Sequence, residues 1–265
     1  MQDFQFKDKY DAYDLVKIMQ LLRAPGGCPW DAEQTHQSIK KNLIEETYEV
    51  IEAINKDDKA LMCEELGDLL MQVVFHALME QESGVFDFDD VADGVCKKLI
   101  ERHPHVFGEV SVSGVDDVLT NWDAIKRKSK GQKTTTESML SVPRELPALM
   151  RATKLQKKAA DVGFDWSDAS GALDKVDEEA AELRAAVANQ DKENIAEELG
   201  DLLFSAVNVS RFVKVDAEEA LTAASDKFLL RFTEVERMAA ERGIDMKTAG
   251  IETLDRLWDE AKLQK

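Results

Sequence analysis

The chain has 265 residues, of which 44% are apolar, and its 53 acidic and 34 basic side chains give a formal net charge of −19. This apolar content excludes a disordered chain, and the acidity argues against nucleic acid as a partner, because binding phosphate backbones requires a basic face. The most apolar stretch, residues 69–79, is too short to span a bilayer, so we predict no membrane segment. The three cysteines form no C-x-x-C pair and are expected to be free thiols, which predicts a cytoplasmic protein.

Helical periodicity runs along the whole chain, in which proline and glycine are sparse. In the first half we predict helices at residues 10–23, 39–55, 58–81, 88–102 and 115–128. Residues 129–137 follow as a polar segment without an apolar period and are predicted to be a linker. In the second half we predict helices at residues 145–161, 170–189, 191–213, 216–241 and 251–263. No strand-like alternation competes, so the predicted fold class is all-α.

The two halves repeat each other, and their acidic motifs recur at a constant offset of 133 residues (197 − 64 and 178 − 45). The heptapeptide E-E-L-G-D-L-L occurs at residues 64–70 and again at 197–203. The pattern E-E-x-x-E precedes it at residues 45–49 and again, with the same separation from the heptapeptide, at 178–182. Self-similarity at a long fixed period indicates a duplicated module. We therefore predict two domains, residues 1–128 and 138–265.

Each module carries four acidic residues on the two helices that contain these motifs. They are Glu46, Glu49, Glu65 and Asp68 in the first copy and Glu179, Glu182, Glu198 and Asp201 in the second. The predicted helix 58–81 is apolar in almost every direction except along the stripe that holds its acids, which predicts that those acids are buried. Buried like charges need compensation, and ligands that are all oxygen suit Mg²⁺, for which Mn²⁺ could substitute. An acidic solvent face that repeats is the alternative.

Basic and aromatic residues recur in both modules at i,i+4 spacing. The pairs are Lys98 with Arg102, repeated as Lys227 with Arg231, and Trp122 with Lys126, repeated as Trp258 with Lys262. Cations and a metal ion can hold phosphates while an aromatic ring stacks on a base, so this combination suits a nucleoside polyphosphate. A solvated helix face is the alternative for each pair taken alone.

The second module carries additional lysines. Lys154, Lys157 and Lys158 stand where the first module has Ile18, Leu21 and Leu22, and Lys175 stands where it has Asn42. We therefore expect residues 138–265 to carry most of the catalysis and residues 1–128 to dimerise or regulate. Ordinary surface charge is the alternative for these lysines.

Three further motifs, G-C-P-W-D at residues 27–31, R-H-P-H-V-F at 102–107 and V-G-F-D-W at 162–166, complete a pattern that resembles the MazG nucleoside triphosphate pyrophosphohydrolases of the all-α pyrophosphatase superfamily. The resemblance covers nearly the whole chain. It implies two tandem copies of a four-helix-bundle-like MazG module, a homodimer, and Mg²⁺-dependent hydrolysis of NTP to NMP and diphosphate. It implies metal ligation by Glu179, Glu182, Glu198 and Asp201, and substrate contacts by Lys175, Lys227, Arg231, Trp258 and Lys262.

Several functional details stay open at the level of sequence. Glu178 could accept a proton from the attacking water, or it could be solvated. Stacking on Trp258 would tolerate any base and so favours a broad substrate range. A di-iron protein would need Glu-x-x-His pairs, whereas the repeated motif on the second acidic helix is Glu-x-x-Asp, and His76, which comes eight residues after Asp68, does not fit that pattern. A non-catalytic helical adaptor and a narrower hydrolase, acting on dUTP or phosphoribosyl-ATP, are the other interpretations. A P-loop enzyme is excluded because G-x-x-x-x-G-K-[ST] is absent.

Overall fold

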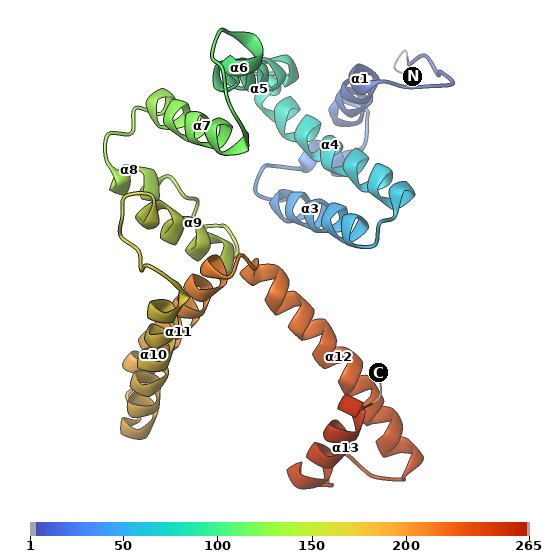
Figure 1. The fold of residues 1–265 in the computed structure, drawn as a ribbon. Helices are drawn as coiled ribbons and strands as arrows, with labels where there is room; N and C mark the ends of the chain where they lie inside the picture. Colours follow the sequence, from blue (N-terminus) through green and yellow to red (C-terminus); the bar gives the residue numbers. More distant parts are fainter. Residues whose placement is uncertain (1–3, 264–265) are drawn as a thin grey trace. The chain divides into compact units, whose positions relative to one another are not determined.

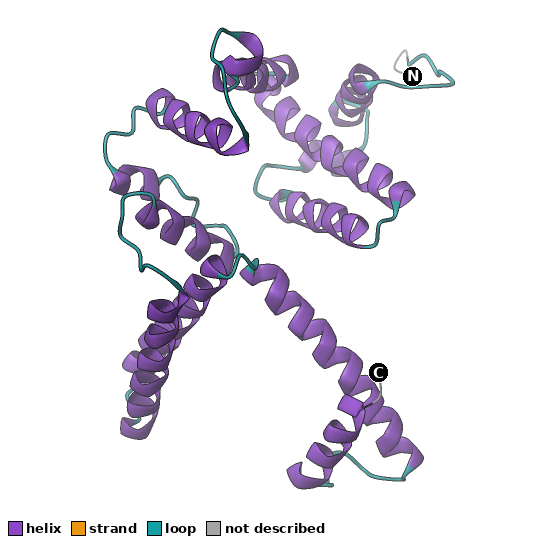
Figure 2. Ribbon diagram, viewed as in Figure 1, coloured by secondary structure: helices purple, strands orange, loops and turns teal. Residues whose placement is uncertain are grey.

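The computed structural model describes residues 4–263, which form thirteen α-helices and no strand (Figures 1 and 2). The predicted all-α fold class is therefore confirmed. The chain divides into two compact units, residues 1–126 (unit 1) and 127–265 (unit 2). The division falls within the last turns of the helix that ends the first repeat.

Unit 1 is built around a hairpin of two helices. Its helices are α1 (Ala12–Arg23), α2 (Pro29–Glu33), α3 (Lys40–Asn55), α4 (Lys59–Glu82), α5 (Phe88–Arg102), α6 (Pro104–Phe107) and α7 (Val115–Ser129), the last of which ends in unit 2. Helices α3 and α4 pack along each other, and α1 and α5 pack on α4 (Figure 1). The buried core joins α1 to the second half of α4 through Met19, Ile39, Val74, Phe75, Leu78 and Met79. Full burial of each such side chain stabilises the fold by roughly 1.5–3 kcal/mol.

Unit 2 repeats the hairpin and adds a second one. Its helices are α8 (Thr135–Leu140), α9 (Ala148–Ala160), α10 (Ala169–Asn189), α11 (Lys192–Phe212), α12 (Ala217–Glu241) and α13 (Ile251–Leu263). Helix α10 packs along α11, α9 packs on α11 and α12, and α13 folds back on α12. The buried residues between α12 and α13 are Val235, Met238, Ala239, Leu257 and Ala261.

The turn of the acidic hairpin has the same construction in both units. Asp57 (φ 52°) and Gln190 (φ 56°), which occupy equivalent positions of the two copies, both adopt the left-handed conformation that ends a helix. The next residue caps the following helix: Asp58 accepts hydrogen bonds from two backbone amides of α4, and Asp191 accepts one from α11. The same local sequence logic therefore sets the connection between the two acidic helices in each copy.

All ten predicted helices are present, with ends within three residues of those expected. The three helices that periodicity missed, α2, α6 and α8, have only four to six residues, too few to show an apolar period. Residues 129–137, predicted to be a linker, contain the end of α7 and the first turn of α8. That turn is fixed by a capping box between Thr134 and Glu137.

Candidate active site

Three carboxylates converge at the acidic hairpin of each unit. In both units two glutamates of the first helix and one of the second place one oxygen each within 4.8 Å of one another. The groups are Glu46, Glu49 and Glu65 in unit 1 and Glu179, Glu182 and Glu198 in unit 2. The i,i+3 spacing on the first helix puts its two acids on one face, and the short turn brings the third beside them. One cation could be held by all three residues of a group.

The fourth predicted acid, an aspartate, lies near each group without belonging to it. The charge of Asp68 helps to raise the pKa of Glu46, and the charge of Asp201 helps to raise the pKa of Glu198. Asp68 is half-buried and Asp201 is exposed. In each unit the four predicted acids are therefore close enough to affect one another's pKa values, and three of them place oxygens close enough to share an ion.

Partial burial, and then repulsion between the acids, raises several of their pKa values. The pKa values of Glu46, Glu65 and Glu198 lie above the ordinary glutamate value, first because partial burial disfavours the charged form and then because neighbouring carboxylates repel it. A divalent cation would remove this repulsion, and an all-oxygen donor set is the set that Mg²⁺ and Mn²⁺ prefer. The residues present therefore fit such a cation.

A lysine distinguishes the acidic group of unit 2. The Lys175 ammonium lies 2.5 Å from Oε1 of Glu179 and 3.0 Å from Oε1 of Glu178, and these two bonds raise the pKa of Lys175, with Glu179 contributing first. Glu179 is buried, with 4% of its surface exposed, whereas Glu178 is exposed. Unit 1 has Asn42 at the equivalent position, so its acidic group has no such counter-charge.

The predicted basic and aromatic residues of unit 2 gather between α12 and α13. The Arg231 guanidinium lies 6.0 Å from the centre of the Trp258 ring, and the Phe228 ring lies 5.1 Å from the same centre. Lys262 forms an ion pair with Asp259 at 2.8 Å. Arg231 and the Trp258 indole thus form a cation–aromatic pair between two helices. The i,i+4 spacing related residues of the same helix and did not predict this contact between helices.

Unit 1 repeats this arrangement. The Arg102 guanidinium lies 5.2 Å from the centre of the Trp122 ring, and the Lys126 ammonium lies 5.0 Å from it. Two cations therefore flank one indole. This similarity shows that the duplication extends beyond the acidic hairpin.

The other predicted cations of unit 2 differ in how they are placed. Lys154 and Lys157 on α9 and Lys227 on α12 are exposed. Lys158 donates a hydrogen bond to the hydroxyl of the buried Ser138. It therefore ties α9 to α8, a structural role that its spacing did not reveal.

Within one chain, the acidic group of unit 2 lies on α10 and α11, whereas Lys227, Arg231 and Lys262 lie on α12 and α13. Among residues 127–263, no hydrogen bond or ion pair joins Lys227, Arg231 or Lys262 to the acidic group. Only Lys175 is bonded to that group.

The first half of α4 is less buried than its pattern predicted. Leu66 and Leu70 are 48% and 38% exposed, and Glu65 is half-buried. Within the chain this part of α4 packs on α3, whereas its second half also packs on α1. The helix is apolar all round, but only part of it is covered within one chain.

The apolar residues that replace lysines in unit 1 serve its core at least in part. Leu22 is partly buried and packs on the core that includes Met19 and Phe75. The core of unit 1 therefore explains why Leu22 is apolar, without an interface at this position.

The polar stripe of α4 also includes a contact that the sequence did not suggest. His76 lies on this stripe and is hydrogen-bonded to His36, which is 40 residues away. No spacing rule connects residues so far apart. The position of His76 within the apolar stretch 69–79 is the one feature of the sequence that could have pointed to a buried contact.

No helix among residues 4–263 combines the length and the apolar character needed to cross a membrane. Both carboxylate groups consist of glutamates alone, and neither includes a histidine. This composition gives no support to the di-iron interpretation, which requires histidine ligands.

Comparison with known proteins gives consistent results. A family model described as the MazG nucleotide pyrophosphohydrolase domain matches residues 34–107 and 170–235, the segments that contain the two acidic groups. A nucleoside triphosphate pyrophosphohydrolase of Escherichia coli K12 is 47% identical over 256 residues, which cover 95% of this chain and 97% of that protein. The nucleoside triphosphate pyrophosphohydrolase/pyrophosphatase MazG of Thermotoga maritima is 45% identical over 249 residues, 94% of each chain.

A third relative has a different length. The uncharacterized protein YabN of Bacillus subtilis is 50% identical over 248 residues, which cover 92% of this chain and half of that protein. The family model and these full-length similarities agree with the duplicated acidic hairpins of the structure. The chain belongs to the MazG nucleotide pyrophosphohydrolase family and contains two tandem copies of its domain.

Proposed function

We propose that this chain is a Mg²⁺-dependent nucleoside triphosphate pyrophosphohydrolase, which converts NTP and water into NMP and diphosphate with a broad range of bases and sugars. The observation that carries the proposal is the group of three carboxylate oxygens within 4.8 Å of one another. It is supported by 47% identity to an E. coli protein that bears the name of this activity.

The acidic residues of unit 2 have distinct roles in this proposal. Glu179, Glu182 and Glu198 would hold the cation, with Asp201 beside them. When bound, the cation supplies positive charge that offsets the charge of the polyphosphate and makes water more acidic. Glu178 is the candidate proton acceptor, because it is exposed to solvent and adjacent in sequence to the buried Glu179.

Lys175 favours unit 2 as the main catalytic unit. In the structure its ammonium is bonded to Glu179 and Glu178. A cation held by the acids would take over this neutralising role, and the ammonium could then turn to a phosphate oxygen. Unit 1 has Asn42 instead and lacks this positive charge, so we assign it to dimerisation or regulation.

The pair of Arg231 and Trp258 supplies the remaining substrate contacts in the proposal, together with Lys227 and Lys262. Guanidinium groups bind phosphate oxygens through two parallel hydrogen bonds, and an indole can stack on any base. Stacking without base-specific hydrogen bonds is the reason to expect a broad substrate range.

We also propose that the protein is a homodimer. Large apolar side chains are exposed along α11 and α12, among them Leu203 (51%), Phe204 (43%) and Leu229 (63%). Extended apolar surfaces of this kind mark interfaces, and a second copy would complete a four-helix bundle. Analytical ultracentrifugation of the parent and of Leu203→Glu tests this: a dimeric parent and a weakened variant are expected, whereas a monomeric parent would contradict it.

Product analysis tests the reaction. The full chain is incubated with each common NTP and dNTP, with Mg²⁺ or with a chelator, and the products are resolved by ion-exchange chromatography. Glu179→Gln and its counterpart in unit 1, Glu46→Gln, form a matched pair. We expect NMP and diphosphate in the presence of Mg²⁺, a loss of roughly 10²-fold or more in Glu179→Gln, and most of the turnover retained in Glu46→Gln.

Each other outcome overturns a specific part of the proposal. Turnover of one nucleotide alone would indicate a narrower hydrolase. Loss of activity in Glu46→Gln with activity retained in Glu179→Gln would reverse the assignment of the units. No turnover of any nucleotide by the folded protein would favour the helical adaptor.

A further inference from the structure

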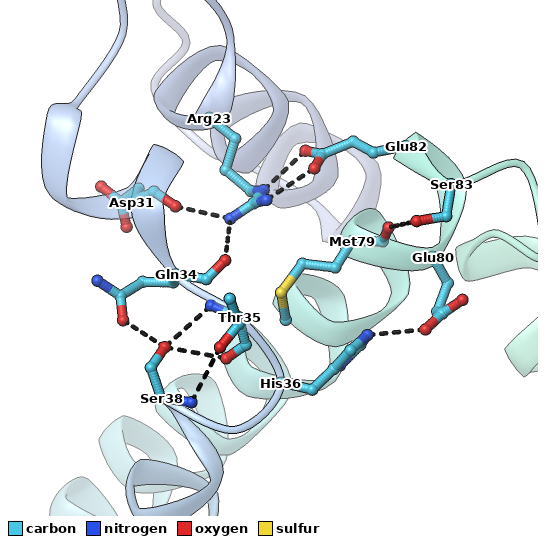
Figure 3. Close-up of polar contacts among 10 residues, drawn as sticks. All are labelled: Arg23, Asp31, Gln34, Thr35, His36, Ser38, Met79, Glu80, Glu82 and Ser83. Carbon is cyan, nitrogen blue, oxygen red and sulfur yellow. Dashed lines mark hydrogen bonds and ion pairs between the residues drawn. The ribbon is translucent and has the colours of Figure 1, made fainter.

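Two histidines and a glutamate form a hydrogen-bonded network in unit 1. His36, in the segment before α3, places its Nδ1 2.7 Å from Nδ1 of His76 on α4, and its Nε2 lies 2.8 Å from Oε1 of Glu80 on the next turn of α4. The two imidazole rings lie edge to edge in nearly one plane, with centroids 5.0 Å apart and planes within 5° of parallel. Figure 3 shows His36 reaching from its loop to Glu80.

The hydrogen bonds determine which ring nitrogens carry protons when both histidines are neutral. The Glu80 carboxylate can only accept, so Nε2 of His36 donates and Nδ1 of His36 is left as an acceptor. Nδ1 of His76 must then donate to it. Nε2 of His76 is consequently unprotonated, and it is the atom that is buried without a hydrogen-bond partner. The network therefore assigns a specific tautomer to His76.

The bond between the two Nδ1 atoms responds to acid. One added proton can enter at Nε2 of His76, after which the proton between the two Nδ1 atoms can shift to His36, so that the charge lies beside Glu80 and the bond is preserved. A second proton places hydrogens on both Nδ1 atoms, which are 2.7 Å apart, so the bond is lost. Burial of the ring and then the neighbouring His36 lower the pKa of His76, which is the direction expected for a pair that resists full protonation.

The charged groups of the neighbouring elements are largely occupied by partners of their own. Arg23 on α1 is paired with Glu82 of α4 (Figure 3). Asp89 at the start of α5 accepts a hydrogen bond from the Tyr13 hydroxyl, and Asp87 caps α5. Lys40 at the start of α3 is exposed. Glu80 is thus the charged group bonded directly to the histidine pair.

The network belongs to the first copy alone. At the constant offset between the copies, His76 corresponds to Val209, Glu80 to Val213 and His36 to Ala169. The surrounding hairpin is otherwise repeated, with the same turn and the same acids. The first copy has therefore placed titratable groups where the second has apolar side chains.

We propose that His36, His76 and Glu80 form an acid-sensitive latch that holds residues 34–39, and with them the start of α3, against α4 in unit 1. Ile39, which is 1% exposed, anchors the same segment in the core. Helix α3 carries Glu46 and Glu49, so opening of the latch would loosen the acidic group of unit 1 and leave unit 2 unchanged. This makes unit 1 the pH-responsive half of the chain.

The sign of the effect follows from linkage. A histidine whose folded pKa is lowered contributes stability that is present above its ordinary pKa of 6.5 and is lost as the pH falls towards the folded value. The latch is therefore closed at pH 7.5 and opens in mild acid. Over the full titration, the closing equilibrium weakens roughly tenfold for each pH unit by which the pKa is lowered.

Histidine ¹⁵N NMR on the full chain tests the latch without any substitution. We expect His76 as the Nδ1–H tautomer at pH 8, and we expect it to titrate below the ordinary histidine pKa of 6.5. An Nε2–H tautomer for His76 at pH 8, or titration of His76 at or above pH 6.5, would refute the proposal.

Two variants and a second readout connect the network to the movement. His36→Phe keeps an aromatic ring but removes both hydrogen bonds, and Glu80→Gln keeps an acceptor oxygen but removes the negative charge. In the parent, hydrogen exchange of residues 40–46, corrected for intrinsic pH effects, is expected to accelerate between pH 7.5 and 5.5, while residues 173–179 of unit 2 do not respond. His36→Phe should exchange rapidly at both pH values. Equal acceleration in both units of the parent would overturn the latch.

Discussion

Replacement of Glu198 by glutamine is expected to stabilise the metal-free protein and to remove most of the stabilisation that Mg²⁺ gives. Partial burial and the charges of Glu182 and Glu179 raise the pKa of Glu198, so its ionised form is disfavoured in the metal-free fold. A carboxylate with a raised folded pKa reduces stability as the pH rises through that pKa, and at pH 7 the repulsion is fully developed. Metal-free Glu198→Gln should therefore unfold at a higher temperature than the metal-free parent.

Mg²⁺ should stabilise the parent much more than the variant. Binding to the folded state alone contributes about 2.7 kcal/mol per site when the free ion is at 100 times its dissociation constant. For a unit of the size of unit 2, this corresponds to a rise in melting temperature of roughly 10 °C. Glu198→Gln removes one of the three oxygens within 4.8 Å together with its charge, so most of this rise should disappear.

Differential scanning calorimetry at pH 7, with a chelator and across a Mg²⁺ titration, measures both effects. Glu197→Gln is the matched control, because it removes the same charge from the adjacent position of α11 but leaves the group of three intact; it should retain the Mg²⁺-dependent rise. The reasoning is refuted if Mg²⁺ raises the melting temperatures of Glu198→Gln and the parent equally, or if Mg²⁺ does not stabilise the parent.

Four further substitutions test the fold that positions the site. Leu257→Ala, at a side chain 2% exposed between α12 and α13, should lower the free energy of unfolding by about 2–5 kcal/mol in denaturant titrations. Gly200→Ala adds a methyl group in open space and should stabilise α11 by up to about 1 kcal/mol, whereas the Cβ of Gly171→Ala would lie 2.3 Å from the Trp166 ring and should change its fluorescence. Asp165→Asn should lower the free energy of unfolding by about 1 kcal/mol at pH 7, because it removes the ion pair with Arg211. Arg211 lowers the pKa of Asp165, so the stability from this pair is present above pH 3.8 and is lost as the pH falls through the folded pKa. Equal melting temperatures of variant and parent at pH 7 would contradict this expectation.

The sequence predicted those features that depend on local spacing. Helix positions follow from an apolar period of 3.6, and the acidic groups follow from i,i+3 spacing on two helices joined by a short turn. The turn itself could have been predicted in more detail, since Asp58 and Asp191 are N-cap residues in equivalent positions. Duplication strengthened each inference, because a coincidental pattern has no reason to recur at a constant offset.

Features that depend on contacts between distant segments were not predictable. The bond from Lys158 to Ser138 spans 20 residues, and the bond from His36 to His76 spans 40. Burial was overestimated for the first half of α4, because periodicity reports which faces avoid water without saying whether the same chain or a second copy covers them. Leu66, which is 48% exposed, is the clearest case.

The acidic hairpins of the two units differ in whether a basic side chain neutralises part of their negative charge. In unit 2 Lys175 is bonded to the buried Glu179. In the proposed function, this places a basic side chain beside both the metal ion and the polyphosphate of the substrate. In unit 1 the equivalent residue is Asn42, and the pKa of Glu46 rises because burial and neighbouring acids act without a counter-charge. A carboxylate group without a lysine competes less well for a polyanionic substrate. This difference supports the proposal that unit 1 dimerises or regulates, and the proposed histidine latch would be one means of regulation.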